Sequence, residues 1–160
     1  MTDSALLRLH TETVQPDWVD YNGHMNVAYY VLVFDHATDV FLNQVGMDAT
    51  LRETTGSSVF VAEAHITYDQ EVMEGEQVYI TTQLLAYDEK RLHIFHRMHR
   101  ATDDALAATN ELMILQVNLN DRRVGPFHED VRERIAAIAK QQAGLAMPDA
   151  AGRQISIRRK

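Results

Sequence analysis

The segment 27–45 constrains the fold most, because its spacing predicts one long helix whose first half is apolar on nearly every side. Its apolar side chains recur at intervals of three and four residues, and Gly46 supplies a C-terminal stop. A helix without a broad polar face has to be enclosed by other elements. The apolar positions of the pattern are Val27, Tyr30, Val31, Phe34, Ala37, Phe41 and Val45.

Strands are predicted both before and after this helix. They are rich in β-branched and aromatic residues, and short polar turns such as Met73-Glu74-Gly75 separate those that follow Gly56. Connections of hairpin length indicate an antiparallel sheet. The predicted strands are Leu7–Val19, Ser58–Tyr68, Gln77–Tyr87, Arg91–Ala101 and Ala105–Leu119.

The C-terminal part is predicted to form a second helix, Glu129–Gln142, which Pro126 opens. From Ala143 the chain is rich in Ala, Gly, Arg and Gln, and we expect it either to be loosely held or to add an edge strand. Without repeats or a linker, we expect one domain over residues 1–145 and a tail over 146–160. The fold class is α+β: an antiparallel sheet of five or six strands wrapped around one long central helix, with a C-terminal helix.

Such a sheet is too wide for one helix to cover, so part of its face and its edges stay open. We therefore expect copies of the chain to associate and to cover these open surfaces. We expect a homodimer or homotetramer, with functional sites at the subunit interface.

Charge and residue types exclude several functions. A formal net charge of -8 argues against broad nucleic-acid contact, which requires clustered Lys and Arg. Without cysteine the chain has no disulfide, thiol nucleophile or thiolate metal ligand. The first residues lack the pattern of a signal peptide, and no apolar run approaches the ~20 residues of a membrane span. We expect a cytoplasmic protein with no nucleic-acid or membrane partner.

The junction Asp20-Tyr21-Asn22-Gly23-His24-Met25-Asn26 comes directly before the long helix. It gathers a carboxylate, an imidazole and an amide around one glycine, and Asn26 is placed to cap the helix. Free N–H groups and the positive end of a helix dipole stabilise an oxygen that becomes negative. Taken alone, Asp before Asn-Gly is most often a turn residue. The junction is therefore either a turn with a cap or half of a catalytic site.

Short motifs follow a fixed order over roughly residues 10–135. They comprise Asp20, Gly23, His24, Met25, Asn26, Tyr30 and Phe34, then the segments 60–68, 74–78 and 121–126. In this order they resemble the hotdog-fold acyl-CoA thioesterases of the 4-hydroxybenzoyl-CoA thioesterase type. The resemblance implies hydrolysis of an acyl-CoA thioester to a free acid and coenzyme A. No cofactor is implied, because coenzyme A is part of the substrate.

The resemblance assigns roles at the junction. Asp20 is expected to act as general base on water or as the nucleophile. Backbone N–H groups of Asn26 and Val27 are expected to polarise the thioester carbonyl. His24 is expected either to hold substrate or water or to pack within the loop. The Asn26 side chain is expected to cap the helix first and to contact substrate second.

Other substrate contacts follow from position in the motifs. Gly23 and Tyr30 are assigned to substrate binding. Lys90 and Arg91 occupy a predicted hairpin tip at which relatives bind the phosphates of coenzyme A. Two adjacent cations on a turn are also an ordinary solvated tip.

Two departures from the family pattern concern the acyl group. Trp18 stands where many relatives have an Asp, and Glu63 stands where an Arg or a neutral residue is common. Strand alternation places Glu63 on one face with Val61 and His65. Such a carboxylate either forms an exposed salt bridge or helps to form a pocket for a cationic acyl group. In the second case the Trp18 ring is taken to lie on the same side of its strand as Asp20 and to offer a cation-binding face. Thioesterases that resemble this chain occur in carnitine catabolism, where betainyl-CoA, a trimethylammonium thioester, is the substrate.

Three histidines at intervals of three, His93, His96 and His99, suggest a metal site. In a strand, however, His93 and His99 point one way and His96 points the other, so the three cannot converge. We predict no catalytic metal. Asp35 and His36, in the middle of the long helix, are expected to bond across the helix or the dimer.

Two other functions compete with hydrolysis. A non-catalytic acyl-CoA-binding module is the alternative, because fold does not fix activity. A dehydratase would need a catalytic histidine with an acidic residue on the helix, and His24 with Asp35 matches that poorly.

Overall fold

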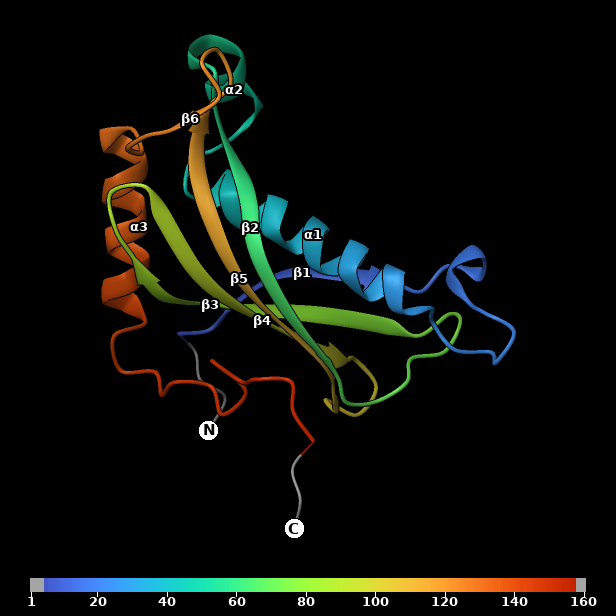
Figure 1. Ribbon diagram of the computed structural model, residues 1–160. Helices are drawn as coiled ribbons and strands as arrows, with labels where there is room; N and C mark the ends of the chain where they lie inside the picture. The colour runs from blue at the N-terminus through green and yellow to red at the C-terminus, as the bar shows by residue number, and fades with distance from the viewer. Residues whose placement is uncertain (1–4, 158–160) are drawn as a thin grey trace.

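The computed structural model describes residues 5–157, which form a curled antiparallel sheet with a long helix lying across it (Figure 1). The elements in chain order are β1 (Leu7–Thr13), the 3-10 helix η1 (Pro16–Trp18), α1 (Val27–Gln44), α2 (Ala49–Thr55), β2 (Ser57–Tyr68), β3 (Gln77–Tyr87), β4 (Arg91–Arg100), β5 (Leu106–Asn118), β6 (Arg123–Val124) and α3 (Glu129–Gln141).

The strands lie side by side in the order β1-β3-β4-β5-β2, and the short β6 pairs with β5. Every neighbouring pair is antiparallel. Within this sheet β1 and β2 are the edges, and α1 runs across one face (Figure 1). The predicted α+β hotdog fold, with six strands around one long helix and a C-terminal helix, is confirmed.

α1 packs one side into the core. Val33, Phe34, Ala37 and Phe41 are completely buried, and the helix contributes to both apolar clusters of the interior. Its second half shares one cluster with α3, whose Ile135 is also fully buried. The prediction that the first half is enclosed on all sides holds only in part, because Val27 and Val31 are exposed by 57% and 41%. One sheet covers one side of a helix and leaves this apolar stripe open.

A buried histidine ties α1 to the sheet. The Thr38 hydroxyl donates to the Phe34 carbonyl, so the same oxygen accepts the Nε2 proton of His96 at 2.9 Å. His96 Nδ1 then accepts from the Thr82 hydroxyl, also at 2.9 Å. Both ring nitrogens of the completely buried His96 are therefore satisfied by a neutral imidazole.

β-Bulges in both edge strands change which side chains share a face. In β2, Val61 pairs with Ile114 and Glu63 pairs with Met113, so Ala62 has no opposite residue. The extra residue reverses the alternation beyond it. The prediction that Val61 and Glu63 share a face is therefore wrong. The register of β1 also shifts between Arg8 and His10.

Three parts of the chain add to or differ from the predicted elements. The first strand ends at Thr13, and Trp18 lies in η1, so the prediction that Trp18 is part of a strand is wrong. The short helix α2 was not predicted, because seven residues give too little periodicity to detect. Over residues 143–157 the described chain forms no strand. Instead it contacts the sheet, where Gln83 donates to the Ala146 carbonyl and Gly152 N–H donates to the Glu111 carboxylate.

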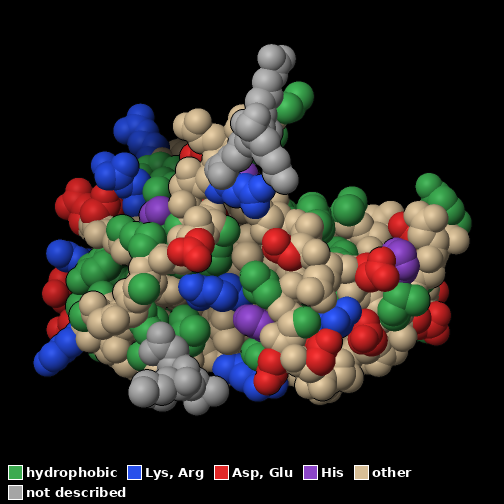
Figure 2. All heavy atoms as spheres, turned by 90° about the horizontal axis from the view of Figure 1, so that it is seen from below, with side chains coloured by type: hydrophobic (Ala, Val, Ile, Leu, Met, Phe, Trp, Pro, Cys, Tyr) green, Lys and Arg blue, Asp and Glu red, His purple; other side chains and the backbone are tan. Residues whose placement is uncertain are grey.

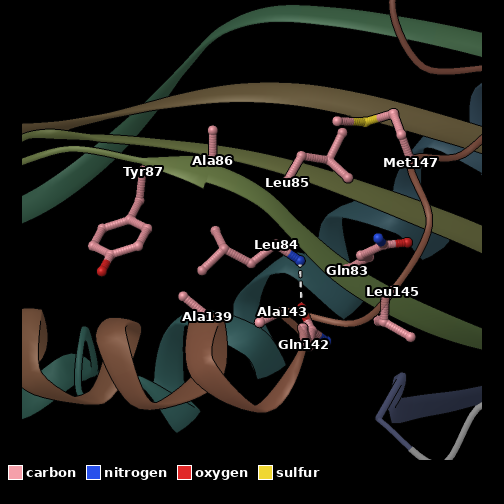
Figure 3. Close-up of a pocket in the computed structure, with 10 residues that line it drawn as sticks. All are labelled: Gln83, Leu84, Leu85, Ala86, Tyr87, Ala139, Gln142, Ala143, Leu145 and Met147. Atoms are coloured by element: carbon pink, nitrogen blue, oxygen red, sulfur yellow. Dashed lines mark hydrogen bonds between the residues drawn. The ribbon is translucent and has the colours of Figure 1, made fainter.

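Gln142 fastens the end of α3 to β3. Its buried side-chain oxygen accepts the Leu84 N–H at 2.8 Å (Figure 3). Its amide nitrogen donates to the Ala5 and Thr82 carbonyls. A cavity of about 340 Å³ lies beside this contact, between β3, α3 and the segment that follows. None of the predicted site residues lines this cavity.

Candidate active site

The loop between η1 and α1 is closed by its own backbone. Val19 and Met25 form an isolated antiparallel bridge, and Asp20 N–H donates to the His24 carbonyl at 3.0 Å. Gly23 N–H donates to the Asp20 carbonyl, also at 3.0 Å. Gly23 has a φ of 78°, a conformation that costs glycine little. These contacts hold Asp20 and His24 opposite each other, immediately before α1.

The first turn of α1 leaves one N–H group for a ligand. Asn26 caps the helix as predicted, because its side-chain oxygen accepts the Ala28 N–H at 3.0 Å. The Asn26 N–H itself donates to the Trp18 carbonyl at 2.8 Å. This bond removes Asn26 from the two N–H groups expected to polarise a carbonyl. The Val27 N–H has no hydrogen-bond partner among residues 5–157 and lies at the positive end of the helix dipole.

The Asp20 carboxylate serves the turn with one of its oxygens. Oδ1 accepts the Asn22 N–H at 2.8 Å, which is the turn role expected of Asp at this position. Oδ2 forms no hydrogen bond or ion pair with any described residue. The side chain is half-buried. The turn and a catalytic role are thus compatible, because they use different oxygens.

His24 faces an acidic loop. Its Nε2 lies 3.3 Å from Glu71 Oε2, in a pair that is largely exposed. Met25 N–H donates to the Val72 carbonyl at 2.8 Å, and His24 forms an isolated bridge with Met73. The loop after β2 therefore packs directly against the junction. An exposed ion pair of this kind adds little to the stability of the fold. Its main effect is to place a negative charge beside the His24 ring.

Aromatic rings flank the start of α1. Trp18 stacks on Tyr29 with centroids 5.5 Å apart and an interplanar angle of 12°. Tyr68 meets Tyr30 edge to face at 5.2 Å, and its hydroxyl donates to the Val27 carbonyl at 3.3 Å. Tyr68 is 47% exposed, so part of its ring is open to a ligand. Two pairs of rings therefore lie at the start of α1, and the faces of aromatic rings attract cations.

Tyr30 is buried, and the loop after β2 occupies its hydroxyl. The hydroxyl donates to the Gln70 carbonyl and accepts the Val72 N–H, both at 3.1 Å. Burial raises the pKa of this phenol, and the nearby Glu71 and Glu76 carboxylates raise it further. Tyr30 therefore positions the loop, and its surroundings are acidic.

Lys90 and Arg91 lie far from the junction within one chain. The loop at residues 71–76, beside His24, leads into β3, and the turn that holds both cations lies at the other end of that strand. Eleven residues of β3 span about 30 Å. Asp88 also holds the Arg91 guanidinium at 2.6 Å. One chain therefore does not bring these cations to Asp20.

Glu63 is exposed on the edge strand β2, where residues 60–64 are all exposed. Its carboxylate forms no hydrogen bond or ion pair with any residue from 5 to 157. The structure therefore does not bring Glu63 together with Trp18 through a shared strand face.

The histidines of β4 do not converge, as predicted. His93 Nε2 pairs with the Glu111 carboxylate at 2.7 Å, whereas His96 is buried beneath α1. His99 stacks on Tyr79. In the described part of the chain a different group has metal-ligand spacing, namely His10, Glu12 and His36.

The surface seen in Figure 2 mixes charges of both signs. Lys and Arg side chains alternate with Asp and Glu on this face and form no continuous basic area. Among the described residues, none of the helices is long and apolar enough to cross a membrane.

Sequence reasoning missed three residues beside the junction: Tyr29, Tyr68 and Glu71. The motif segment 60–68 includes Tyr68, but nothing in the sequence indicates that the ring meets the start of α1. Glu71 lies in a loop whose position depends on the Tyr30 hydroxyl. Periodicity carries no signal for such contacts.

Known proteins are similar to this chain over nearly its whole length. Residues 14–135 match the model of the thioesterase-like superfamily. A betainyl-CoA thioesterase from Pseudomonas aeruginosa is 40% identical over 154 residues, covering 96% of this chain and 97% of that one. An L-carnitine dehydrogenase/betainyl-CoA thioesterase from Rhizobium meliloti is 38% identical over 98% of this chain, which spans only 31% of that longer protein.

A solved structure agrees with these sequence matches. A Staphylococcus aureus protein in complex with CoA superposes with a TM-score of 0.90 and 32% identity, covering 96% of this chain and 97% of that one. The family match, the full-length relative and the solved structure therefore agree with one another. The chain belongs to the thioesterase-like superfamily and is a hotdog-fold acyl-CoA thioesterase.

Proposed function

We propose that the substrate is betainyl-CoA, which is hydrolysed to betaine and coenzyme A. The observation that carries this proposal is the pair of aromatic contacts at the start of α1, near two carboxylates. Trp18, Tyr29 and Tyr68 supply ring faces. Glu71 and Glu76 supply negative charge, which Arg100 beside them offsets in part. A trimethylammonium group binds favourably to such surroundings. The full-length similarity to a betainyl-CoA thioesterase supports the same substrate.

Asp20 and Val27 are the groups we assign to the reaction. The Val27 N–H polarises the thioester carbonyl and stabilises the oxygen as it becomes negative. Asp20 either removes a proton from the attacking water or attacks the carbonyl itself to form an anhydride that water then hydrolyses. In both routes the thiolate of coenzyme A leaves and one water molecule is consumed. In the anhydride route the new oxygen of the acid comes from Asp20 when water attacks the aspartyl carbon, and water then replaces that oxygen on Asp20. No cofactor is needed.

His24, Asn26 and Gly23 shape this site. Gly23 and the Asn26 cap fix the loop and the first turn. His24 stands opposite Asp20 in the loop and pairs with Glu71, from where it can orient water or the acyl group. We assign Tyr30 to holding the loop after β2 against the helix, because both contacts of its hydroxyl are to that loop. The hydroxyl is not assigned to substrate.

We further propose that the protein acts in the cytoplasm as an assembly of at least two copies. Coenzyme A binds between two of these copies. The β2 edge has no neighbouring strand in the described chain, and its Phe60 and Val61 are 44% and 47% exposed. Unpaired edges of this kind favour pairing with another chain. In such an assembly Lys90 and Arg91 of one copy contact the phosphates of substrate bound at the other copy's Asp20. Glu63, on the same edge, then faces the neighbouring acyl site.

The substrate proposal is tested with a matched pair of esters. In 3,3-dimethylbutyryl-CoA a neutral carbon replaces the quaternary nitrogen of betainyl-CoA, and the shape stays nearly the same. We expect kcat/KM for betainyl-CoA to be at least about tenfold higher, since a desolvated cation-π contact contributes on the order of 1–2 kcal/mol. Equal values for the two esters would exclude recognition of the cation.

Two single substitutions test which aromatic ring recognises the cationic acyl group. Tyr68→Leu is expected to narrow the difference between the two esters. Tyr87→Leu removes a ring of similar exposure, 44%, at the other end of β3 and is expected to leave the difference unchanged. Equal effects of both substitutions would mean that the rings near α1 do not bind the acyl group.

A further inference from the structure

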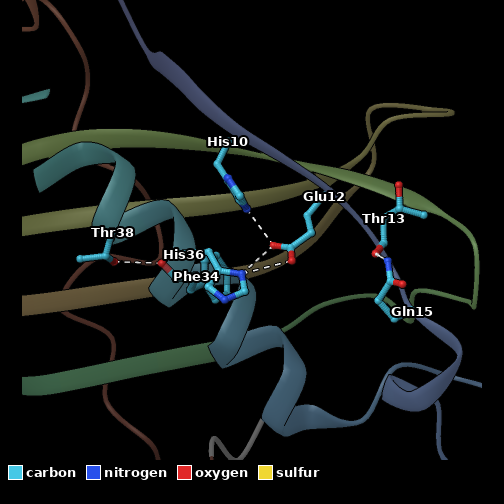
Figure 4. Close-up of polar contacts among 7 residues, drawn as sticks. All are labelled: His10, Glu12, Thr13, Gln15, Phe34, His36 and Thr38. Carbon is cyan, nitrogen blue, oxygen red and sulfur yellow. Dashed lines mark hydrogen bonds and ion pairs between the residues drawn. The ribbon is translucent and has the colours of Figure 1, made fainter. Parts of the chain in front are cut away.

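Three side chains from β1 and α1 converge on one another (Figure 4). His10 and Glu12 are two residues apart on β1 and therefore share a face of the strand. His36 projects toward them from the middle of α1 (Figure 4). One ligand atom from each of the three lies within 4.8 Å of the other two.

The β1 bulge contributes to this arrangement. Arg8 pairs with Thr81 and His10 pairs with Ile80, so Leu9 has no opposite residue. Beyond it the alternation is reversed. His10 and Glu12 then occupy the face that carries the fully buried Ile80, on the side of α1. A regular strand would direct them away from the helix.

The contacts centre on one carboxylate. Glu12 Oε2 lies 2.7 Å from His10 Nε2 and 2.9 Å from His36 Nδ1, and Glu12 Oε1 lies 3.1 Å from His36 Nδ1. The side chains of His10 and Glu12 are only about one-fifth exposed, at 19% and 20%, and that of His36 is 38% exposed. The group is thus partly shielded and open on the His36 side.

We propose that His10, Glu12 and His36 form a binding site for a transition-metal dication such as Zn²⁺. Two imidazole nitrogens and one carboxylate oxygen are a ligand set that Zn²⁺ takes, with a fourth position left to water. In a tetrahedral site with bonds of about 2.0–2.1 Å, neighbouring ligand atoms lie about 3.3 Å apart. The contacts from Glu12 to the two histidines, 2.7–3.1 Å, need only a small expansion to reach that geometry, and the three ligand atoms all lie within 4.8 Å of one another.

The polar contacts of the group suit such an exchange. Without a metal, each imidazole nitrogen that contacts Glu12 carries the ring proton, so two N–H groups point at one carboxylate. A neutral imidazole can carry its proton on either ring nitrogen, so a dication takes a lone pair from each histidine while the proton stays on the other nitrogen. The carboxylate supplies the third ligand atom.

The site is a structural clamp and not part of hydrolysis. His36 follows Val27 by nine positions, which corresponds to about 13 Å along the helix. A metal there joins the edge strand β1 to α1. Mg²⁺ and Ca²⁺ prefer oxygen ligands and are not expected to compete.

Isothermal titration calorimetry of the full chain with ZnCl₂, together with thermal unfolding, tests the proposal. We expect one Zn²⁺ per chain and a higher Tm with Zn²⁺ than with EDTA. Glu12→Gln keeps the size and hydrogen-bonding capacity of the side chain but removes the charge. Glu12→Gln and His36→Ala are each expected to lower the affinity by more than about tenfold and to abolish the rise in Tm.

His93→Ala is the matched control, because His93 forms a 2.7 Å pair with Glu111 but has no third ligand in the described chain. It is expected to leave binding and the rise in Tm unchanged. The proposal is overturned if wild-type protein binds no Zn²⁺, or if binding survives Glu12→Gln and His36→Ala. Loss of binding in His93→Ala alone would place the metal elsewhere and contradict it equally.

Discussion

At the scale of single residues, the two carboxylate oxygens of Asp20 have different surroundings. Oδ1 accepts the Asn22 N–H, whereas Oδ2 has no partner among the residues described. Asn26 also has two separate contacts: its side chain caps α1, and its N–H donates to the Trp18 carbonyl. Val27 thus keeps the N–H group that we propose for the thioester carbonyl. Each residue of the junction has a distinct task.

His96 makes the stability of the protein dependent on pH. Burial lowers its pKa to about 3 in the folded protein, whereas an unfolded histidine titrates near ~6.5. Between these values the unfolded state binds the proton and the folded state does not, so stability is full above pH ~6.5 and falls as the pH drops. The expected loss is about 1.4 kcal/mol per pH unit until the folded protein also protonates.

Urea unfolding at several pH values between 4 and 8 measures this dependence. The neutral variant His96→Gln is expected to be less stable at pH 7, because it fills the space between Thr38 and Thr82 less well, but to show a flatter dependence below pH ~6.5. The same slope in both proteins would show that other groups control acid unfolding.

At the scale of elements, the long helix and the four main strands were predictable because periodicity records which side of an element is buried. The limits of β3 were predicted at Gln77 and Tyr87, as observed. Bulges were not predictable, because one unpaired residue such as Ala62 leaves no compositional sign yet reverses the strand beyond it. The role of the Asn26 N–H was not predictable either, since it depends on where the Trp18 carbonyl lies.

The turn from α2 into the edge strand β2 depends on Gly56. This glycine caps α2 with a φ of 74°, and a Cβ added there would lie 2.6 Å from Asn120 Nδ2. Gly56→Ala is expected to destabilise the protein by about 1–2 kcal/mol, measured by urea unfolding. At Gly144 φ lies outside the left-handed range and a Cβ would meet no atom within 4 Å, so Gly144→Ala is the control and should be neutral. Equal stability of the two variants would contradict this account of the turn.

At the scale of the whole molecule, the features assigned to substrate lie at opposite ends of one chain. The Asp20 junction is beside the loop before β3, and Lys90 and Arg91 follow its far end. A site that uses both needs two copies, and the open edge of β2 offers a surface for pairing. In the assembly that we propose, different subunits bind the acyl group and the coenzyme A phosphates.

Subunit mixing tests this arrangement. Asp20→Asn is expected to be inactive, and Lys90→Glu with Arg91→Glu is expected to raise KM strongly for the CoA ester. A mixed dimer contains one site with Asp20 from one subunit and both cations from the other, so each mixed dimer should have about half of the wild-type activity. After random exchange of equal amounts about half of the dimers are mixed, so the mixture should recover about a quarter. Sedimentation and subunit exchange are followed in parallel. Exchange without restored activity would place the cations and Asp20 in separate sites, or leave the cations without a role.

The most direct test of the central claim is single-turnover hydrolysis of betainyl-CoA by Asp20→Asn. This substitution retains an oxygen to accept the Asn22 N–H, so the loop is expected to keep its form. We expect hydrolysis to slow by about 10²–10⁴-fold while the Kd for the CoA ester changes little, because the binding surfaces remain. Hydrolysis by the folded variant at the wild-type rate would show that Asp20 is only a turn residue and that the reaction proceeds elsewhere.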